Sequence, residues 1–228
     1  MSGADREIQE RARRFMDEEL IPLEVETELS GGKLSEDVRE KHHHMAIELG
    51  LWAMNMPKEL GGGGLSMFQQ VLVSEQIGRV TNGLGWCIHT PPAWAPDVVT
   101  QEQLERWILP TIRGERQECY AITEEVAGSD VDAIQATARL DGDEYVLNGR
   151  KWHVTSFGSA DYVFFQGKIE GGPNAGSHAM FFVDKDTPGI TLRKLDTLGR
   201  RALGTYEVFF DEVRVPADRL VGEPHKGW

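Results

Sequence analysis

Residues 120–130 read Y-A-I-T-E-E-V-A-G-S-D, and the rest of the chain is best interpreted outward from them. The stretch begins as an alternating run typical of a strand. It then breaks into a loop at residues 127–129, whose small side chains let a ligand reach the backbone. Successive N–H groups in a tight turn can bind an anion, and the Ser129 hydroxyl can add a donor. On this short motif alone, an ordinary polar turn is the simpler interpretation.

Downstream of a break at residues 111–114, the chain shows the period-two pattern of β structure. Residues 137–140 and 145–147 flank Asp141-Gly142, which predicts a hairpin, and Asn148-Gly149 predicts a second turn directly afterwards. Further strands are predicted at residues 162–165, 179–183, 190–195 and 206–210. No long helix separates them, which argues against a Rossmann sheet. Residues 118–228 are therefore predicted to form an antiparallel β-sandwich or barrel.

Residues 1–117 carry the signals of helices instead. Apolar residues recur at helical spacing from Ile8 to Leu20, and a second segment runs from a Ser35 cap to Gly50. The patterns S-x-x-Q at residues 66–69 and T-x-x-Q at residues 100–103 match capping boxes that open two more helices. The predicted fold class is α+β, with an N-terminal α-helical bundle domain followed by the β domain.

Composition narrows the class of partner and the compartment. The net charge is −13 and no basic stripe is present, so a nucleic-acid partner is not expected. The two cysteines, Cys87 and Cys119, form no CxxC motif, which indicates neither a disulfide framework nor a zinc site. The first 20 residues are charged, and no apolar run approaches the ~20 residues that span a bilayer. We therefore expect a cytoplasmic protein without a membrane span.

Two segments imitate functional motifs. Residues 61–64 are four glycines, but no strand precedes them and no G-x-G-x-x-G follows, so they are predicted to connect helices. Residues 42–44 are three histidines on a predicted helix, where successive side chains rotate by about 100° and do not converge on one ion. A solvated face with one half-buried histidine is expected there.

Residues 148–156 read N-G-R-K-W-H-V-T-S and fall on a predicted strand. Regular alternation would place His153 and Thr155 on one face and Trp152 and Val154 on the other. A flat ring beside a hydroxyl can receive an aromatic heterocycle, by stacking and by hydrogen bonding to its edge. A solvent-facing sheet surface is the alternative interpretation.

Four motifs, in this order and spacing, resemble the acyl-CoA dehydrogenase family. They are P-K-E-L-G-G-x-G-L-S at residues 57–66, Y-A-I-T-E-x-x-A-G-S-D at residues 120–130, N-G-R-K-W-x-x-T at residues 148–155, and F-D-E-V-R-V-P followed by V-G-E and K-G at residues 210–227. The resemblance implies that FAD is bound by Tyr120, Ile122, Thr123, Gly128, Ser129, His153, Val154 and Thr155, and that Ser129 also contacts the acyl-CoA.

The same resemblance implies a role for each part of this site. Tyr120, Ile122 and Thr123 would flank the isoalloxazine ring. Residues 128–129 would meet the pyrophosphate, and Thr155 would reach flavin N5. The implied reaction is α,β-dehydrogenation of an acyl-CoA thioester in fatty acid metabolism, with an electron-transferring flavoprotein as acceptor and a homo- or hetero-oligomeric assembly. The sequence departs from the family pattern at two places. Glu125-Val126 replaces Pro-Gly, which predicts a looser turn and a carboxylate that repels pyrophosphate, and His153 replaces a larger aromatic ring.

The family's glutamate base lies in a C-terminal helical domain that the resemblance does not reach, since the sequence given ends at Trp228. Asp196, Asp211 and Glu212 match no base motif, so no catalytic residue is assigned. The chain is expected to be an acyl-CoA dehydrogenase without the domain that carries the base. The alternatives are a non-catalytic flavin- or acyl-CoA-binding subunit of a full-length paralogue, and, more distantly, a flavin monooxygenase or acyl-CoA oxidase.

Overall fold

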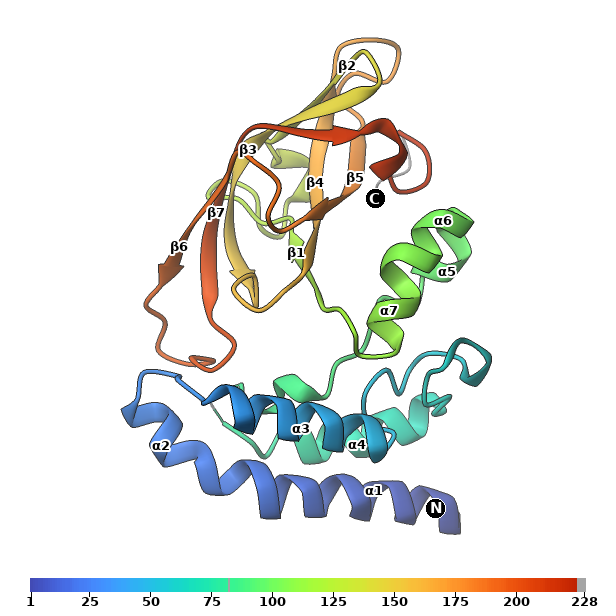
Figure 1. Ribbon diagram of the computed structural model, residues 1–228, viewed down its shortest axis with the longest axis vertical. Helices are drawn as coiled ribbons and strands as arrows, with labels where there is room; N and C mark the ends of the chain where they lie inside the picture. Colours follow the sequence, from blue (N-terminus) through green and yellow to red (C-terminus); the bar gives the residue numbers. More distant parts are fainter. Residues whose placement is uncertain (82, 225–228) are drawn as a thin grey trace. The chain divides into compact units, whose positions relative to one another are not determined.

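The computed structural model describes residues 1–81 and 83–224 (Figure 1). The K-G of the closing motif, at residues 226–227, lies outside the described residues. The chain divides into two compact units. The helical unit comprises Met1–Pro96, Leu104–Glu115 and Thr197–Leu203, and the sheet unit comprises Asp97–Gln103, Arg116–Asp196 and Gly204–Trp228. Each unit has its own buried apolar cluster, as expected where two cores form along one chain.

The main helices of the helical unit are α1 (Gly3–Phe15), α2 (Glu24–Leu29), α3 (Glu36–Glu48), α4 (Met67–Ile77) and α7 (Leu109–Ile112). Two further short helices are α5 (Ala95–Val98), which crosses from the helical unit into the sheet unit, and α6 (Gln101–Gln103), which belongs to the sheet unit. Helix α4 begins with the predicted capping box, because the Ser66 hydroxyl accepts from the Gln69 N–H and the Gln69 amide oxygen accepts from the Ser66 N–H. Helix α3 begins after Ser35 as predicted, although the Ser35 side chain makes no capping bond. Among the described residues, no helix is long and apolar enough to cross a membrane.

The glycine run connects helical segments, as predicted: a short turn at Lys58–Leu60 precedes it and α4 follows it. The histidine run is more buried than predicted. His42 is enclosed and its Nε2 lies 3.3 Å from Glu19, while half-buried His43 contacts the Gly114 carbonyl oxygen through Nε2 at 2.8 Å. The helical period alone does not show this, because Glu19 and Gly114 come from distant parts of the sequence.

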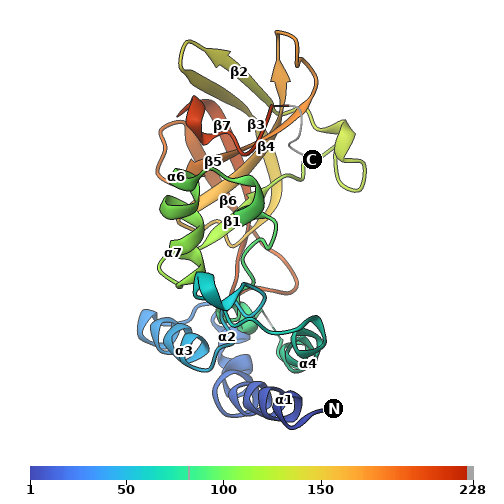
Figure 2. The same cartoon turned by 90° about the vertical axis from the view of Figure 1, so that its right-hand side faces the viewer.

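The sheet unit contains β1 (Glu118–Ala121), β2 (Thr137–Asp141), β3 (Glu144–Thr155), β4 (Tyr162–Glu170), β5 (His178–Asp184), β6 (Ile190–Leu195) and β7 (Thr205–Pro216). Their order is β1-β4-β2-β3-β7-β6, with β5 paired to β4, in one curled sheet (Figures 1 and 2). Most pairs are antiparallel as predicted, but β1–β4 and β2–β4 are parallel, so the sheet is mixed. The chain leaves β1, makes the β2–β3 hairpin, and returns through β4 in the direction of β1 and β2.

The hairpin between β2 and β3 forms as predicted, with Asp141 paired to Glu144 and Gly142 at a φ of 69°. The second predicted turn, at Asn148-Gly149, is wrong, because both residues lie inside β3. The β3–β7 register shifts between Leu147 and Gly149, which marks a local irregularity of the kind that a bulge makes. Asn148 stabilises it by accepting from the Glu212 N–H at 2.8 Å.

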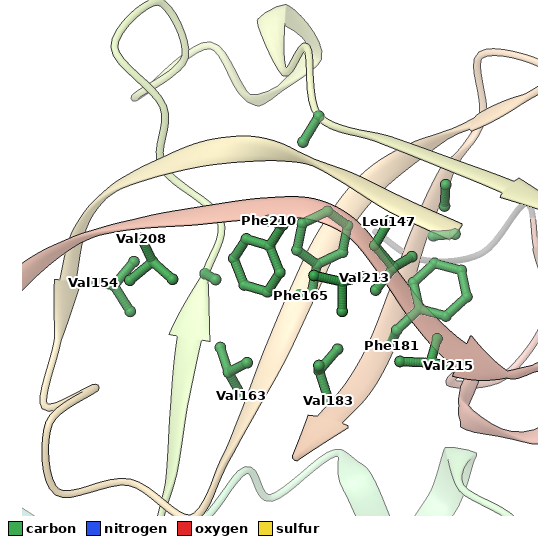
Figure 3. Packing of buried hydrophobic residues seen from close by; sticks show 14 of the residues in the cluster. Leu147, Val154, Val163, Phe165, Phe181, Val183, Val208, Phe210, Val213 and Val215 are labelled. Carbon is green, nitrogen blue, oxygen red and sulfur yellow. The ribbon is translucent and has the colours of Figure 1, made fainter. Parts of the chain in front are cut away.

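The core of the sheet unit lies on the inner side of the curled sheet. Side chains of β3, β4, β5 and β7 interdigitate there, including Phe165, Phe181 and Phe210 (Figure 3). The Phe165 and Phe210 rings lie 4.6 Å apart between centroids. Each such side chain contributes roughly 1.5–3 kcal/mol on burial, which makes this cluster the rigid support for the loop after β1.

Candidate functional site

The loop after β1 closes immediately into a tight turn. The Glu124 N–H donates to the Ala127 carbonyl at 2.9 Å, and the Ala127 N–H donates back to the Glu124 carbonyl at 3.2 Å. Glu125 and Val126 are the two residues enclosed by this pair of bonds. Two reciprocal backbone bonds therefore define the turn without proline or glycine at these positions, and the looser turn expected from their replacing Pro-Gly stays a prediction.

The structure brings the loop and β3 together at one backbone hydrogen bond. The Trp152 N–H donates to the Thr123 carbonyl at 2.7 Å. This bond sets Ile122 and Thr123 beside the segment that contains His153, Val154 and Thr155. The two stretches singled out in the sequence are thus neighbours in space, although 28 residue positions separate Thr123 from Lys151 in the printed sequence.

The end of β3 departs from regular alternation. The β3–β7 register shifts between Lys151 and Val154, and His153 has a φ of 55°, a left-handed conformation that histidine tolerates better than most residues. Trp152 and His153 stack on each other, with ring centroids 5.5 Å apart and planes 8° apart. The predicted opposite placement of these two side chains is wrong, because the extra residue breaks the period of two.

The predicted binding residues differ in accessibility. Tyr120, Gly128, Ser129 and His153 are exposed, Ile122, Thr123 and Thr155 are half-buried, and Val154 is 1% exposed. Val154 packs its side chain into the core, so that side chain is not available to a ligand. The Tyr120 ring, 36% exposed, stacks on Phe164 with centroids 5.1 Å apart.

The chemistry of the free donors fits a phosphate- and ring-bearing ligand. Within residues 1–81 and 83–224, the hydroxyls of Thr123, Ser129 and Thr155 have no hydrogen-bond partner, and each can donate and accept. A Cβ built on Gly128 meets no atom within 4 Å, so the space beside this glycine is open. The residues present therefore have hydrogen-bond donors and, at Gly128, an open backbone of the kind that FAD would require.

Two side chains that motif reasoning did not assign lie under this site. Glu124, 7% exposed, accepts from Lys151 Nζ at 2.7 Å, and Lys151 is fully buried. Lys151 Nζ also donates to the Ile122 carbonyl at 2.9 Å. Burial lowers the pKa of Lys151 to about 8, although the hydrogen bond that Lys151 donates to Glu124 opposes that shift. The only sequence signal was the presence of an acid and a lysine in the two motifs, and alternation did not distinguish them from solvent-facing residues.

Arg150 and Glu125 lie at the rim of a hollow of about 360 Å³ that is also lined by Glu124, Val126, Gln135, Ala136, Gly149 and Trp152. Arg150 Nη1 lies 3.5 Å from the Glu125 carboxylate, and Arg150 also pairs with buried Glu207. The Arg150 charge offsets that of Glu125, so the repulsion of an anionic ligand predicted for this carboxylate is reduced. The effect is modest, since both side chains are largely in water.

A helical unit followed by a curled mixed sheet, with a donor-bearing loop against a bulged strand, defines an α+β chain of two distinct parts. Residues 2–115 match the acyl-CoA dehydrogenase N-terminal domain, and residues 119–213 match the acyl-CoA dehydrogenase middle domain. The chain belongs to the acyl-CoA dehydrogenase family, which confirms the resemblance seen in its motifs.

Relatives and solved structures agree with this membership. The chain is 34% identical to the mitochondrial short-chain specific acyl-CoA dehydrogenase of Bos taurus, over 97% of this chain and 54% of that protein. It therefore spans about half the length of this relative. A probable acyl-CoA dehydrogenase from Mycobacterium abscessus superimposes with a TM-score of 0.88 at 33% identity, over 100% of this chain and 60% of that one. An acyl-CoA dehydrogenase from Bacillus anthracis, solved in complex with FAD, gives a TM-score of 0.84 at 28% identity, over 100% of this chain and 38% of that one.

Proposed function

We propose that this chain supplies the flavin-binding part of an FAD-dependent acyl-CoA dehydrogenase. The observation that carries the proposal is the Trp152 N–H to Thr123 carbonyl bond, which joins two segments bearing unpartnered hydroxyls. The residues that would hold FAD are Tyr120, Ile122, Thr123, Gly128, Ser129, His153, Val154 and Thr155. The FAD bound by the relative from Bacillus anthracis supports the choice of cofactor.

Each part of the site would act on a different portion of the ligand. The open backbone at Gly128 and the Ser129 hydroxyl would donate to the pyrophosphate, and Ser129 would also contact the acyl-CoA. Thr155 would donate a hydrogen bond at the edge of the flavin ring, while His153, held at the bulge, would lie against its face. Bound FAD supplies a hydride acceptor for removing hydrogen from the α and β carbons of the thioester.

Three carboxylates of the sheet unit give no reason to assign them as the proton-abstracting base. Asp196, Asp211 and Glu212 are exposed, and Glu212 is engaged by Asn148 at 2.6 Å. A base needs to lie within hydrogen-bond reach of the proton it removes and benefits from a shielded position. We therefore propose that the base is contributed from outside residues 1–228. An electron-transferring flavoprotein or similar acceptor and an oligomeric assembly are parts of the same proposal.

The test is titration of the purified chain with FAD, followed by the flavin absorption bands and the quenching of flavin fluorescence. Wild type is expected to bind. Gly128→Ala is expected to keep its unfolding midpoint, because nothing lies within 4 Å of the new Cβ, and to lose at least about tenfold in FAD affinity.

Gly199→Ala is the matched control, since Gly199 also has open space around it and no positive φ. Its FAD affinity should equal that of wild type. A wild-type chain that retains no flavin absorption once unbound FAD has been removed, or a Gly128→Ala variant that binds as well as wild type, would sink the assignment.

An assay of turnover with acyl-CoA distinguishes an active dehydrogenase from a non-catalytic subunit. With FAD bound, acyl-CoA that bleaches the flavin and passes electrons to a dye indicates a dehydrogenase, and oxygen consumption indicates an oxidase or monooxygenase. If the chain binds FAD but acyl-CoA does not reduce the bound flavin, the chain is a non-catalytic subunit or needs a second chain that supplies the base.

A further inference from the structure

Beneath the proposed flavin residues, Glu124 and Lys151 connect the loop to β3 from the inner side. Lys151 Nζ lies 2.7 Å from Glu124 Oε1 and 2.9 Å from the Ile122 carbonyl oxygen, and it faces the Phe165 ring at 5.4 Å. Lys151 is fully buried and Glu124 is 7% exposed, so the contacts between them are made inside the protein. Their function therefore lies in what they connect.

Glu124 also holds the far end of the same loop. Its Oε2 accepts from the Gln135 N–H at 2.7 Å, and its Oε1 accepts from the Ala136 N–H at 3.0 Å. One carboxylate thus binds the second half of β3 through Lys151 and the end of the loop through two backbone donors. The loop from residue 122 to residue 136 is closed on a single buried group, which is rigid because every bond to it is charge-assisted.

We expect this ion pair to fix the geometry of the surrounding backbone more than it stabilises the fold. A buried ion pair recovers little more than the desolvation of its two charges, whereas its directional bonds allow one arrangement of the backbone around it. In this chain two such bonds lie next to each other. Lys151 Nζ donates to the Ile122 carbonyl, and one residue further along each segment the Trp152 N–H donates to the Thr123 carbonyl.

We propose that Glu124 and Lys151 are a positioning pair that sets the distance between residues 122–123 and residues 153–155, and with it the place of the flavin ring. The inference rests on the proposed function, because it assigns the pair a role toward FAD. Neither residue touches the ligand. They act through the Ile122 and Thr123 carbonyls on one side and through the β3 bulge on the other.

The experiment compares Lys151→Met, Glu124→Gln and the double variant Glu124→Gln/Lys151→Met in the full chain. Three quantities are measured: the unfolding midpoint, the FAD dissociation constant with the position of the bound-flavin absorption band, and hydrogen exchange at the Trp152 amide without FAD. Lys168→Met is the matched control. Lys168 Nζ also donates to a carbonyl of this loop, that of Asp132 at 2.6 Å, but it does so at the exposed surface.

The double variant distinguishes an effect on the position of the flavin from an effect on the stability of the fold. Lys151→Met leaves a buried carboxylate without its cation and is expected to lower the midpoint, while the double variant leaves no unpaired charge and regains most of it. If the pair positions the flavin, the double variant still binds FAD at least about tenfold more weakly, shifts the flavin band, and exchanges the Trp152 amide faster than wild type. The Lys168→Met control changes none of these three.

Two results overturn the inference. In the first, the double variant regains FAD affinity, flavin band and amide protection together with its midpoint, which makes the pair purely structural. In the second, Lys151→Met leaves Trp152 exchange unchanged. Failure of the proposed function has a different signature, because wild type then binds no FAD while exchange at Trp152 still reports whether the pair holds the two segments together.

Discussion

Replacing Gly149 by alanine tests how closely β3 approaches Ala136, at the end of the loop after β1. A Cβ built on Gly149 lies 2.5 Å from Ala136 Cβ and 2.9 Å from Ala136 Cα, and its φ of 155° is one that residues with side chains rarely adopt. Carbon atoms in contact normally lie about 3.5–4.0 Å apart. Gly149→Ala must therefore move Ala136 by about 1 Å, or open β3 by the same amount.

The cost follows from what Ala136 holds. Its N–H donates to Glu124 at 3.0 Å and its carbonyl accepts from the Lys168 N–H at 2.8 Å, so a shift of that size weakens at least one of these bonds. Overpacking costs about 1–3 kcal/mol. A buried group left without its hydrogen bond costs about 1–3 kcal/mol. The expected loss for Gly149→Ala is thus about 2–6 kcal/mol.

Urea unfolding followed by far-UV circular dichroism and by tryptophan fluorescence measures this loss. Gly142→Ala is the control, because Gly142 has a φ of 69° in the hairpin turn but nothing within 4 Å of a built Cβ. Backbone strain alone should cost that variant about 1 kcal/mol. A Gly149→Ala variant no less stable than Gly142→Ala would refute the close approach of β3 to Ala136.

Three further predictions concern buried groups. Burial lowers the pKa of Lys151 from 10.5 to about 8, so between these values the folded chain binds fewer protons than the unfolded chain. The unfolding free energy of wild type minus that of Lys151→Met should therefore rise from pH 7.5 to 9.5 in urea titrations, and a flat or falling difference contradicts this. Burial raises the pKa of Cys87 to about 12 and raises that of Cys119 as well, so neither thiol should react with a disulfide reagent at pH 8 until urea is added; one equivalent labelled in the native chain would be inconsistent with their burial. Glu207→Gln should cost about 1–3 kcal/mol, because the buried carboxylate pairs with two arginines, while Glu144→Gln at the surface should cost less than about 1 kcal/mol, and equal costs would argue against the buried network.

Local chemistry accounts for the parts of the fold that the sequence predicts well. Strand β6 begins and ends at the predicted residues, and the capping box at residues 66–69 opens α4 as expected. Both depend on neighbours a few positions apart, such as alternating side chains or a hydroxyl three residues before its donor. The directions of β1 and β2 relative to β4 were not predictable in this way, because they depend on how a long connection crosses the sheet.

The candidate site shows more sharply which features neighbouring residues predict and which depend on distant segments. The motifs indicate both segments and name the residues proposed to hold FAD, but regular alternation misplaces Trp152 and His153. The bulge between Lys151 and Val154 arises in the pairing of β3 with β7, whose residues lie about 50 positions further along the sequence. A period of two describes an isolated strand, and only the partner strand determines where it breaks.

By itself, the sequence determined the family, through four motifs in a fixed order, and it determined the change from helical to β structure near residue 118. Tertiary structure alone decided that Thr123 meets Trp152, that the turn at residues 124–127 closes without proline, and that Glu124 and Lys151 are buried partners. The physical reason is that motifs and periodicity are properties of adjacent residues. Burial, register and ion pairing, in contrast, exist only once distant segments are packed together.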